Sequence, residues 1–209
     1  MSISKGKFIS FEGIDGCGKS TQVKMLVNAM NNTERNTILV REPGGTIISE
    51  EIRQILLHRH ISNISDRTEA LLMTGSRAQL TYEVIMPKLI NGQNVIADRF
   101  YDSTLAYQGG GRNLDLDWLI KLNHFATYDL EPDVTFLIDI LPEEASKRKS
   151  KEGDRIERAG IELQTLVRDT YLELSIRFKE RIVVIDGHDT IENIHSLIIE
   201  DLKRKKIIQ

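Results

Sequence analysis

The residues that most constrain this chain form the segment GIDGCGKS at positions 13–20. The segment fits the pattern G-x-x-x-x-G-K-[ST], in which glycines let backbone N–H groups face phosphate oxygens. An apolar run at 7–13 predicts a strand before it, and apolar residues at helical spacing in 19–31 predict a helix after it. The helix N-terminus adds positive potential for the phosphates. The segment therefore predicts a bound nucleoside triphosphate, with Lys19 on its β- and γ-phosphates and Ser20 as a ligand of Mg²⁺.

The same segment leaves the reaction open, because many protein classes bind a triphosphate in this way. A GTPase needs a base-reading element resembling N-K-x-D, which the sequence lacks. A nucleotide-dependent switch needs no pocket for a second substrate, whereas a kinase does. We expect the nucleotide to contact a continuous set of residues: Gly13, Ile14, Asp15, Gly16, Cys17, Gly18, Lys19, Ser20 and Thr21.

Four more strand-length apolar runs follow, and they alternate with helical patterns; the runs are 36–42, 94–100, 133–140 and 181–187. Strands that are apolar on both faces and alternate with helices imply a parallel sheet covered on both sides. The expected fold class is α/β: a three-layer sandwich of the P-loop NTPase type, with a five-stranded parallel sheet flanked by helices. The length of 209 residues fits one domain over 1–209.

Helical patterns at 47–58, 66–91 and 101–108 lie between these strands. Asp66 is the expected N-cap of the long helix. Pro87 is expected to kink that helix or to end its regular part.

Composition excludes several other classes. The net charge is −3, so no overall basic field suits nucleic acid. The single cysteine, Cys17, excludes an intrachain disulfide and is expected to fill space beside the P-loop. The five histidines show no metal-ligand spacing. No apolar stretch reaches the roughly 18 to 20 residues that span a membrane, and no signal peptide opens the chain, so we expect a cytoplasmic protein without a membrane partner.

Charged residues and glycines collect where the predicted strands end. Ligands of parallel sheets bind at the carboxyl ends of the strands, so these residues are candidates for a site. Arg99 offers a planar fork of donors that suits the phosphate of an acceptor nucleotide. Asp98 is a candidate to hold the metal through water, or to orient Arg99.

Three polar stretches are hard to explain as packing: REPGGT at 41–46, SRAQ at 76–79 and DRFYDSTLAYQGGGR at 98–112. With the P-loop, they resemble the thymidylate kinase family in order and spacing. The resemblance covers the chain from Phe8 to the last helix. It implies transfer of the γ-phosphate of ATP to dTMP, giving dTDP and ADP for dTTP synthesis, with Mg²⁺ as cofactor. It also implies a homodimer formed through helices that include 66–91.

The resemblance also implies roles for residues in the acceptor pocket. Arg77 would read the thymine carbonyl, Thr104 and Gln108 would border the base, and Tyr107 would lie against the sugar, where it disfavours a 2′-hydroxyl. Arg53 matches an arginine that contacts the acceptor. We interpret Glu42, Pro43 and the glycines after them as a wall of the monophosphate pocket, because glycine lets the chain turn closely over a ligand. Glu69 and Tyr82 are predicted to be surface residues.

One position departs from the family pattern. Met73 stands where the family has a phenylalanine that stacks on thymine. A thioether still contacts an aromatic face, but the stack is softer and less selective than a ring.

The charged stretch 147–160 resembles the lid of the family. Members without an arginine in the P-loop supply a catalytic arginine from this lid, and positions 14–17 of this P-loop are Ile, Asp, Gly and Cys. Arg155 matches that arginine best, and Arg158 is a second candidate. Arg148 is expected to pack on adenine, with 186–190 bordering the adenine site.

Asp15 places a carboxylate inside the phosphate loop. The family carries an acid at this position, which faces the acceptor nucleotide. We hypothesise that Asp15 contacts the sugar 3′-hydroxyl, directly or through water, or helps to place the metal or Lys19. Two alternatives to a thymidylate kinase remain: another pyrimidine nucleoside-monophosphate kinase, for example one acting on dUMP, and a non-catalytic NTP-dependent switch.

Overall fold

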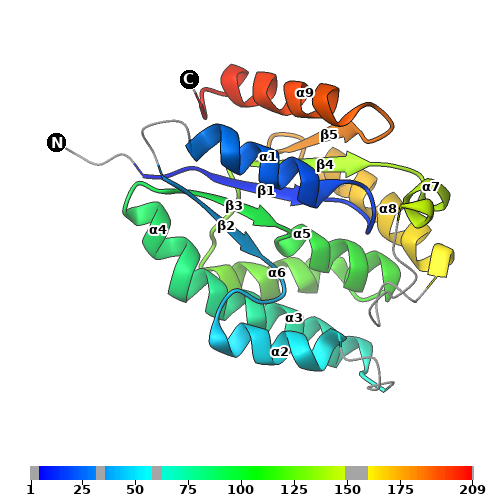
Figure 1. Cartoon of the computed structure of the whole chain (residues 1–209). Helices are drawn as coiled ribbons and strands as arrows, with labels where there is room; N and C mark the ends of the chain where they lie inside the picture. Colours follow the sequence, from blue (N-terminus) through cyan, green and yellow to red (C-terminus); the bar gives the residue numbers. More distant parts are fainter. Residues whose placement is uncertain (1–4, 32–35, 58–62, 149–159, 209) are drawn as a thin grey trace.

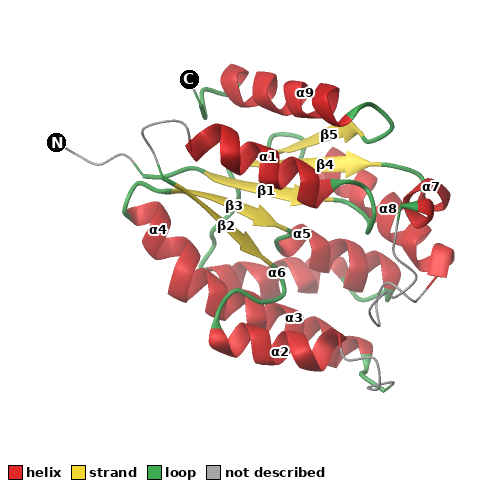
Figure 2. Ribbon diagram, viewed as in Figure 1, coloured by secondary structure: helices red, strands yellow, loops and turns green. Residues whose placement is uncertain are grey.

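A computed structural model describes residues 5–31, 36–57, 63–148 and 160–208. Its five strands form one parallel sheet in the order β2-β3-β1-β4-β5. The strands are β1 (Phe8–Glu12), β2 (Thr37–Arg41), β3 (Asn94–Asp98), β4 (Val134–Asp139) and β5 (Ile182–Asp186). All five arrows point the same way in Figure 2. The predicted α/β fold with a five-stranded parallel sheet is confirmed.

Helices cover both faces of the sheet (Figure 1). On one face lie α1 (Lys19–Asn31) and α9 (Ile191–Arg204). The other face carries the remaining long helices, and α2 packs on α3. These elements are α2 (Ile47–Leu57), α3 (Asp66–Leu80), η1 (Thr81–Ile85), α4 (Met86–Ile90), α5 (Tyr101–Thr104), η2 (Leu105–Gly111), α6 (Leu116–Thr127) and α8 (Gly160–Arg177). The short helix α7 (Pro142–Lys147) follows β4.

The centre of the sheet is the best-buried part of the core. Every residue of β1 is buried, as expected for a strand with neighbours on both sides and helices on both faces. Two polar side chains in this interior satisfy each other, because Ser10 Oγ lies 2.7 Å from Thr135 Oγ1 on β4. The edge strands β2 and β5 alternate in burial instead. The P-loop therefore follows a strand that is buried along its whole length.

The long helix predicted at 66–91 is helical almost throughout but not uniform. Its N-cap is Ser65, whose hydroxyl accepts from the Thr68 N–H at 3.2 Å, so the prediction of Asp66 as N-cap is wrong by one residue. The regular α-helix ends at Leu80 and continues through the π-helical segment η1 into α4, which contains Pro87. Proline has no N–H to donate, and a π-helical turn just before it ends the regular part, as predicted. The helix expected at 101–108 likewise continues as the π-helical segment η2 to Gly111.

The C-terminal helix also begins at a definite cap. Thr190 accepts at Oγ1 from the Asn193 N–H at 3.2 Å, so a hydroxyl side chain starts α9. Among the described residues, no helix is long and apolar enough to cross a membrane.

Candidate active site

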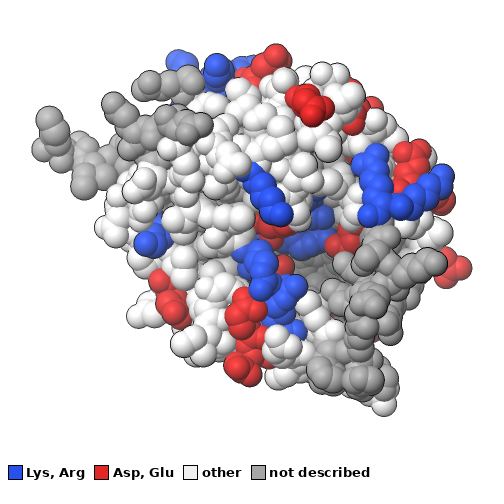
Figure 3. Space-filling model, in the orientation of Figure 1, with Lys and Arg blue, Asp and Glu red and all other residues white. Residues whose placement is uncertain are grey.

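A cavity of about 800 Å³ opens at the carboxyl ends of the strands. In the view of Figure 3, basic side chains gather around a hollow in the middle of this face, with carboxylates among them. Most residues predicted for the site line this cavity: Asp15, Gly16, Cys17, Gly18, Lys19, Ser20, Thr21, Glu42, Pro43, Arg53, Met73, Arg77, Asp98, Arg99, Thr104, Tyr107, Gln108 and Arg148. Parallel strands bring residues far apart in the sequence to one edge, as the strand-end rule predicts.

The P-loop backbone adopts a conformation that suits glycine, because all three of its glycines have positive φ. Gly13 has φ +135°, and a Cβ there would lie 2.5 Å from the Ile138 carbonyl oxygen. Gly18 has φ +103°. Such backbone is accessible to glycine without strain. Two predicted contacts need correction: Gly13 and Ile14 do not line the cavity, and the Ile14 side chain is buried in the core.

Those two residues act through their carbonyl groups instead. Lys19 is buried, and its Nζ donates to Gly13 O at 3.0 Å and to Ile14 O at 2.9 Å. The same Nζ lies 3.6 Å from the Cys17 sulfur, which fills space beneath the loop as predicted. The loop therefore holds the ammonium group at the cavity, where it is available to phosphate oxygens.

The two residues predicted to hold a metal meet at the cavity. Ser20 Oγ at the start of α1 donates to Asp98 Oδ2 at the end of β3, at 2.7 Å. A hydroxyl and a carboxylate are hard oxygen donors of the kind Mg²⁺ takes, with phosphates and water completing its shell. No cluster of three or more His, Cys, Asp or Glu side chains suited to a metal occurs in the described part of the chain. The donor set therefore fits a metal that is bound largely by the nucleotide.

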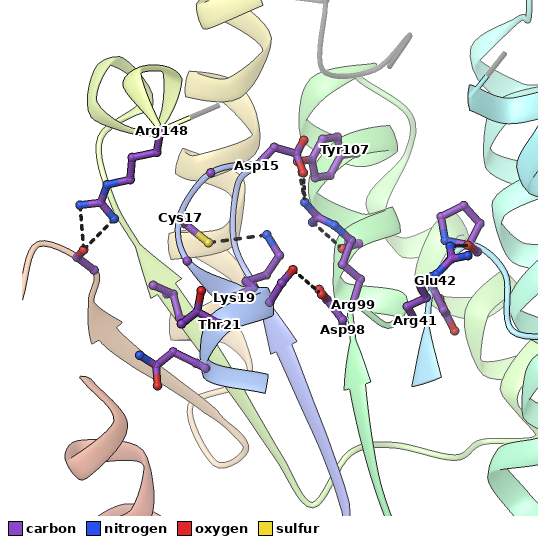
Figure 4. Close-up of a pocket in the computed structure, with 18 of the residues that line it drawn as sticks. Asp15, Cys17, Lys19, Thr21, Arg41, Glu42, Asp98, Arg99, Tyr107 and Arg148 are labelled. Carbon is purple, nitrogen blue, oxygen red and sulfur yellow. Dashed lines mark hydrogen bonds and ion pairs between the residues drawn. The ribbon is translucent and has the colours of Figure 1, made fainter. Parts of the chain in front are cut away.

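Arg99 joins the P-loop to the other half of the cavity. Its backbone is left-handed, at φ 74°. Its Nη2 pairs with Asp15 Oδ1 and donates to the Tyr107 hydroxyl at 3.3 Å, and that hydroxyl donates to Asp15 Oδ2 at 3.0 Å. Figure 4 shows the three side chains converging from the P-loop, the end of β3 and η2. Burial raises the pKa of Tyr107, so its hydroxyl remains protonated.

A buried carboxylate lies behind Arg99. Glu12 ends β1 and accepts three hydrogen bonds: from the Phe100 N–H at 2.7 Å, from Ser103 Oγ at 2.6 Å and from the Tyr171 hydroxyl at 2.8 Å. Arg99 Nη1 in turn donates to Ser103 Oγ at 3.1 Å and to the Tyr171 hydroxyl at 3.3 Å. Burial, followed by the nearby charge of Asp102, raises the pKa of Glu12 to about 7.

Among the residues predicted to contact the base, Arg77 makes the most polar contacts. Its Nε donates to Glu42 Oε2 at 2.6 Å, and its Nη2 lies 2.6 Å from the same oxygen. Its Nη1 donates to Thr104 Oγ1 at 2.8 Å and to Asn123 Oδ1 at 2.7 Å, while Nη2 donates to Phe100 O at 3.2 Å. Burial raises the pKa of Glu42, and the contact with Arg77 opposes that rise. A base carbonyl would therefore share these N–H groups rather than meet free ones.

The loop after β2 is held by its own glycines and by two arginines. The Pro43 carbonyl accepts from Arg53 Nη1 at 2.8 Å and from Arg41 Nη1 at 3.1 Å. Gly44 has φ +127°, and a Cβ there would lie 2.4 Å from Glu50 Oε1. The loop is thus fixed as one wall of the cavity, with Arg53 beside it.

Gln108, which is also predicted to border the base, forms a buried hydrogen-bonded pair with Glu69. Gln108 Nε2 donates to Glu69 Oε1 at 2.9 Å, and Arg112 Nε donates to the same oxygen at 3.3 Å. Glu69 is only 2% exposed, so its prediction as a surface residue is wrong; Tyr82, 64% exposed, is on the surface as predicted. The Glu69 carboxylate accepts from the Gln108 amide nitrogen, which turns the Gln108 carbonyl away from it.

Arg148 and three residues of the stretch predicted to border adenine lie together at the cavity. Arg148 donates through Nη1 and Nη2 to the Gly187 carbonyl, at 3.4 Å each. Gly187, Asp189 and Thr190 line the cavity with it. The predicted lid arginines, Arg155 and Arg158, lie outside the described residues.

Sequence reasoning missed Glu12, Ser103, Tyr171, Asn123 and the role of Glu69. A carboxylate within an otherwise apolar buried strand is a usable signal for Glu12. Ser103 lies within the DRFYDSTLAYQ stretch, but the sequence suggested no role for it. Tyr171 and Asn123 lie on amphipathic helices, where nothing local separates them from packing residues.

The fold and site together define a class of protein. A P-loop with a lysine and a metal-type donor pair opens directly into a second polar pocket, and an arginine stands where the two pockets meet. A nucleotide-dependent switch needs only the first pocket. The arrangement is that of a P-loop kinase with a small acceptor substrate.

Comparison with known proteins gives the family. The thymidylate kinase family model matches residues 11–198. A thymidylate kinase of Thermoanaerobacter sp. (strain X514) is 46% identical over 201 residues, which are 96% of this chain and 98% of that protein. A thymidylate kinase of Caldanaerobacter subterraneus subsp. tengcongensis is 47% identical over 197 residues, 94% of each chain. The crystal structure of thymidylate kinase from Ehrlichia chaffeensis matches with a TM-score of 0.78 at 33% identity, over 95% of this chain and 99% of that one. The chain belongs to the thymidylate kinase family.

Proposed function

We propose that this chain transfers the γ-phosphate of ATP to dTMP, giving dTDP and ADP. The observation that carries the proposal is the shared cavity, in which P-loop and acceptor pocket meet at the Arg99–Asp15 pair. Phosphoryl transfer asks the protein mainly to align two substrates and to stabilise charge. A single cavity with a donor site, an acceptor site and a cation between them meets that need.

Donor binding is assigned to the P-loop. Backbone N–H groups of 15–21 and the Lys19 ammonium would hold the phosphates of ATP, and Arg148 would pack beside adenine. Ser20 and Asp98 would hold Mg²⁺, which when bound neutralises charge on the β- and γ-phosphates.

Acceptor binding is assigned to the opposite half. Arg77, Thr104 and Gln108 would border the base, with Met73 against its face. Tyr107 would lie against the sugar. Glu42, Pro43 and Arg53 would form the wall on the side of α2.

Arg99 would bind the phosphate of dTMP and align it for in-line attack. Asp15 already contacts Arg99 and Tyr107, which supports a role in placing these groups as well as the proposed contact with the 3′-hydroxyl. Arg155 would close over the transferring phosphoryl group from the lid, an assignment that rests on the sequence.

A coupled ADP-release assay with a panel of acceptors tests the proposal. We expect dTMP to be preferred over dUMP, dCMP and the ribose form of TMP, and dTDP to appear as product. Lys19→Ala is the matched loss-of-function control. Equal turnover of dCMP would contradict the assigned substrate, and nucleotide binding without dTDP would favour the switch.

Arg155→Ala tests the lid assignment. Removing a charge that acts on the transferring group should lower kcat by on the order of 10³-fold while changing dTMP binding only modestly. Arg158→Ala is the paired variant. Full activity in the double variant would refute a lid arginine.

We further infer a cytoplasmic homodimer, on the family resemblance. Exposed apolar side chains on α2, α3 and α6 support it, among them Ile47 at 84%, Leu71 at 53% and Phe125 at 85% exposed. Sedimentation velocity should give twice the monomer mass, and Phe125→Glu should shift the protein toward monomer.

A further inference from the structure

We propose that Glu12 is a positioning residue for Arg99, acting through the hydroxyl groups of Ser103 and Tyr171. The inference rests on the proposed function, in which Arg99 aligns the acceptor phosphate. Glu12 itself does not line the cavity. It is fully buried one layer behind, where β1 ends beside β3.

The hydrogen bonds of Glu12 with the two hydroxyl groups have a fixed direction. Glu12 Oε2 accepts from both hydroxyl groups, at 2.6 Å from Ser103 and 2.8 Å from Tyr171. Each hydroxyl has one hydrogen to give. With both hydrogens directed at the carboxylate, both oxygens present lone pairs to Arg99 Nη1. Glu12 thus makes two ambivalent hydroxyl groups into acceptors for the guanidinium.

Glu12 also supports the backbone around Arg99. Arg99 has a left-handed φ of 74°, which costs a non-glycine residue free energy unless its surroundings hold it. The Arg99 N–H donates to Phe11 O at 3.0 Å, and the next N–H, of Phe100, donates to Glu12 Oε1 at 2.7 Å. Glu12 therefore holds Arg99 both at its main chain and at one edge of its guanidinium.

The two terminal nitrogens of the Arg99 guanidinium have different partners. Nη1, at the more buried edge, contacts Gly13 O, Ser103 and Tyr171, whereas Nη2 contacts Asp15 and Tyr107. Asp15 and Tyr107 both line the cavity, whereas of the three partners of Nη1 Ser103 alone does. Loosening the buried edge would leave the cavity-facing edge free to rotate, so the acceptor phosphate would be bound but poorly aligned.

Glu12→Gln is the sharpest test, because it replaces one acceptor oxygen of the carboxylate with a donor N–H group. The Phe100 N–H requires an acceptor, so the amide oxygen would take that place. The amide nitrogen would then face the two hydroxyl groups as a donor, and their hydrogens would turn toward Arg99. Glu12→Gln thus keeps the volume and reverses the polarity.

We expect Glu12→Gln to lower kcat by on the order of 10- to 100-fold, with a smaller change in KM for dTMP. Tyr171→Phe should give a smaller loss with the same signature, because Ser103 remains. Glu173→Gln is the matched control: it makes the same change on an exposed residue of α8 and should retain wild-type kinetics. Unchanged kcat in folded Glu12→Gln and Tyr171→Phe would overturn the inference.

A pH profile separates positioning from simple packing. The charged and titratable groups around Glu12 are Arg99 after β3, Asp102 on α5 and Tyr171 on α8, with Asp15 and Tyr107 beyond Arg99. Ionised Glu12 is the active form, so kcat/KM for dTMP should rise as pH rises through about 7. In Glu12→Gln, the rise of kcat/KM with pH should instead follow the second ionisation of the substrate phosphate, with its midpoint near pH 6. The same midpoint of this rise in wild type and Glu12→Gln would contradict the positioning role of Glu12.

A crystal structure of Glu12→Gln supplies a readout that does not depend on activity. We expect Arg99 Nη1 to have left Ser103 and Tyr171. An unmoved Arg99 would overturn the inference even in an active enzyme. Absence of dTDP formation by the wild-type protein would instead refute the proposed function, with the position of Arg99 still deciding the role of Glu12.

Discussion

Glu12 and Asp15 are three residues apart on either side of Gly13, yet their environments differ. Glu12 is fully buried, and burial raises its pKa to about 7. Asp15 lies at the cavity and pairs directly with Arg99. Arg99 therefore lies between a carboxylate of the core and a carboxylate of the site. We make a separate prediction for each carboxylate.

For Glu12 the prediction concerns stability. Its pKa is higher in the folded protein, about 7, than its ordinary value of 4.5, so the folded state binds the proton more tightly. Its contribution to stability is fully present below pH 4.5 and is lost as pH rises through about 7. As pH rises from 5 to 8, the free energy of unfolding of the wild type should therefore fall relative to that of Glu12→Gln, by on the order of 2 kcal/mol. Urea denaturation at both pH values measures the gain; a difference independent of pH would exclude it.

For Asp15 the prediction concerns the sugar. Asp15→Asn keeps the shape but removes the charge that Arg99 contacts, so turnover of dTMP should fall. A contact with the 3′-hydroxyl predicts that the variant also loses most of its preference for dTMP over the 3′-deoxy analogue, as measured by kcat/KM. Retention of that preference would limit Asp15 to orienting Arg99 and Tyr107.

At the scale of elements, buried polar contacts tie helices to strand ends. Arg181, just before β5, donates from Nη1 and Nη2 to the Asp102 carboxylate on α5 at 2.6 and 2.8 Å. The two side chains are 9% and 1% exposed. Asp102 precedes Ser103 by one residue, so the pair also fixes the helix that carries the Arg99 network.

Breaking that pair should be costly. Arg181→Met leaves the Asp102 charge buried without its partner, and we expect a loss of about 3–5 kcal/mol in the free energy of unfolding. The double variant Asp102→Asn/Arg181→Met should recover part of that loss, because no charge remains buried. Chemical denaturation of the wild type, the two single variants and the double variant gives the coupling free energy; equal stability of wild type and Arg181→Met would contradict a structural role for the pair.

At the scale of the whole molecule, the cavity couples ligand binding to stability, because P-loop, β2 loop, α3 and η2 all contribute to it. A ligand at 100 times its Kd adds about 2.7 kcal/mol to the stability of the native state. For a chain of this size, that gain raises Tm by roughly 5–10 °C.

We therefore expect ATP with Mg²⁺, and dTMP alone, each to raise Tm in thermal denaturation. Lys19→Ala should abolish the shift caused by ATP and keep the shift caused by dTMP. A protein stabilised by ATP but not by dTMP would lack the acceptor site.

The sequence by itself determined the fold class, the P-loop and most of the residues that line the cavity. These features are local: a fixed spacing of glycine, lysine and serine after an apolar strand, and polar stretches placed where strands end. Lys19, Ser20 and Asp98 could be assigned because parallel strands always present the same ends to a ligand. The expectation for Met73 also came from its position alone.

The tertiary structure decided what lies behind those residues. Tyr171 reaches Glu12 across 159 positions, and Asn123 reaches Arg77 across 46. Glu69 lies on a helix whose pattern allows exposure, yet η2 covers it and Gln108 bonds it. Local spacing specifies which groups point at a ligand, whereas burial and hydrogen-bond direction arise only when distant helices pack on the sheet. For that reason the place of Arg99 at the cavity could be predicted, and the contacts that hold Arg99 in place could not.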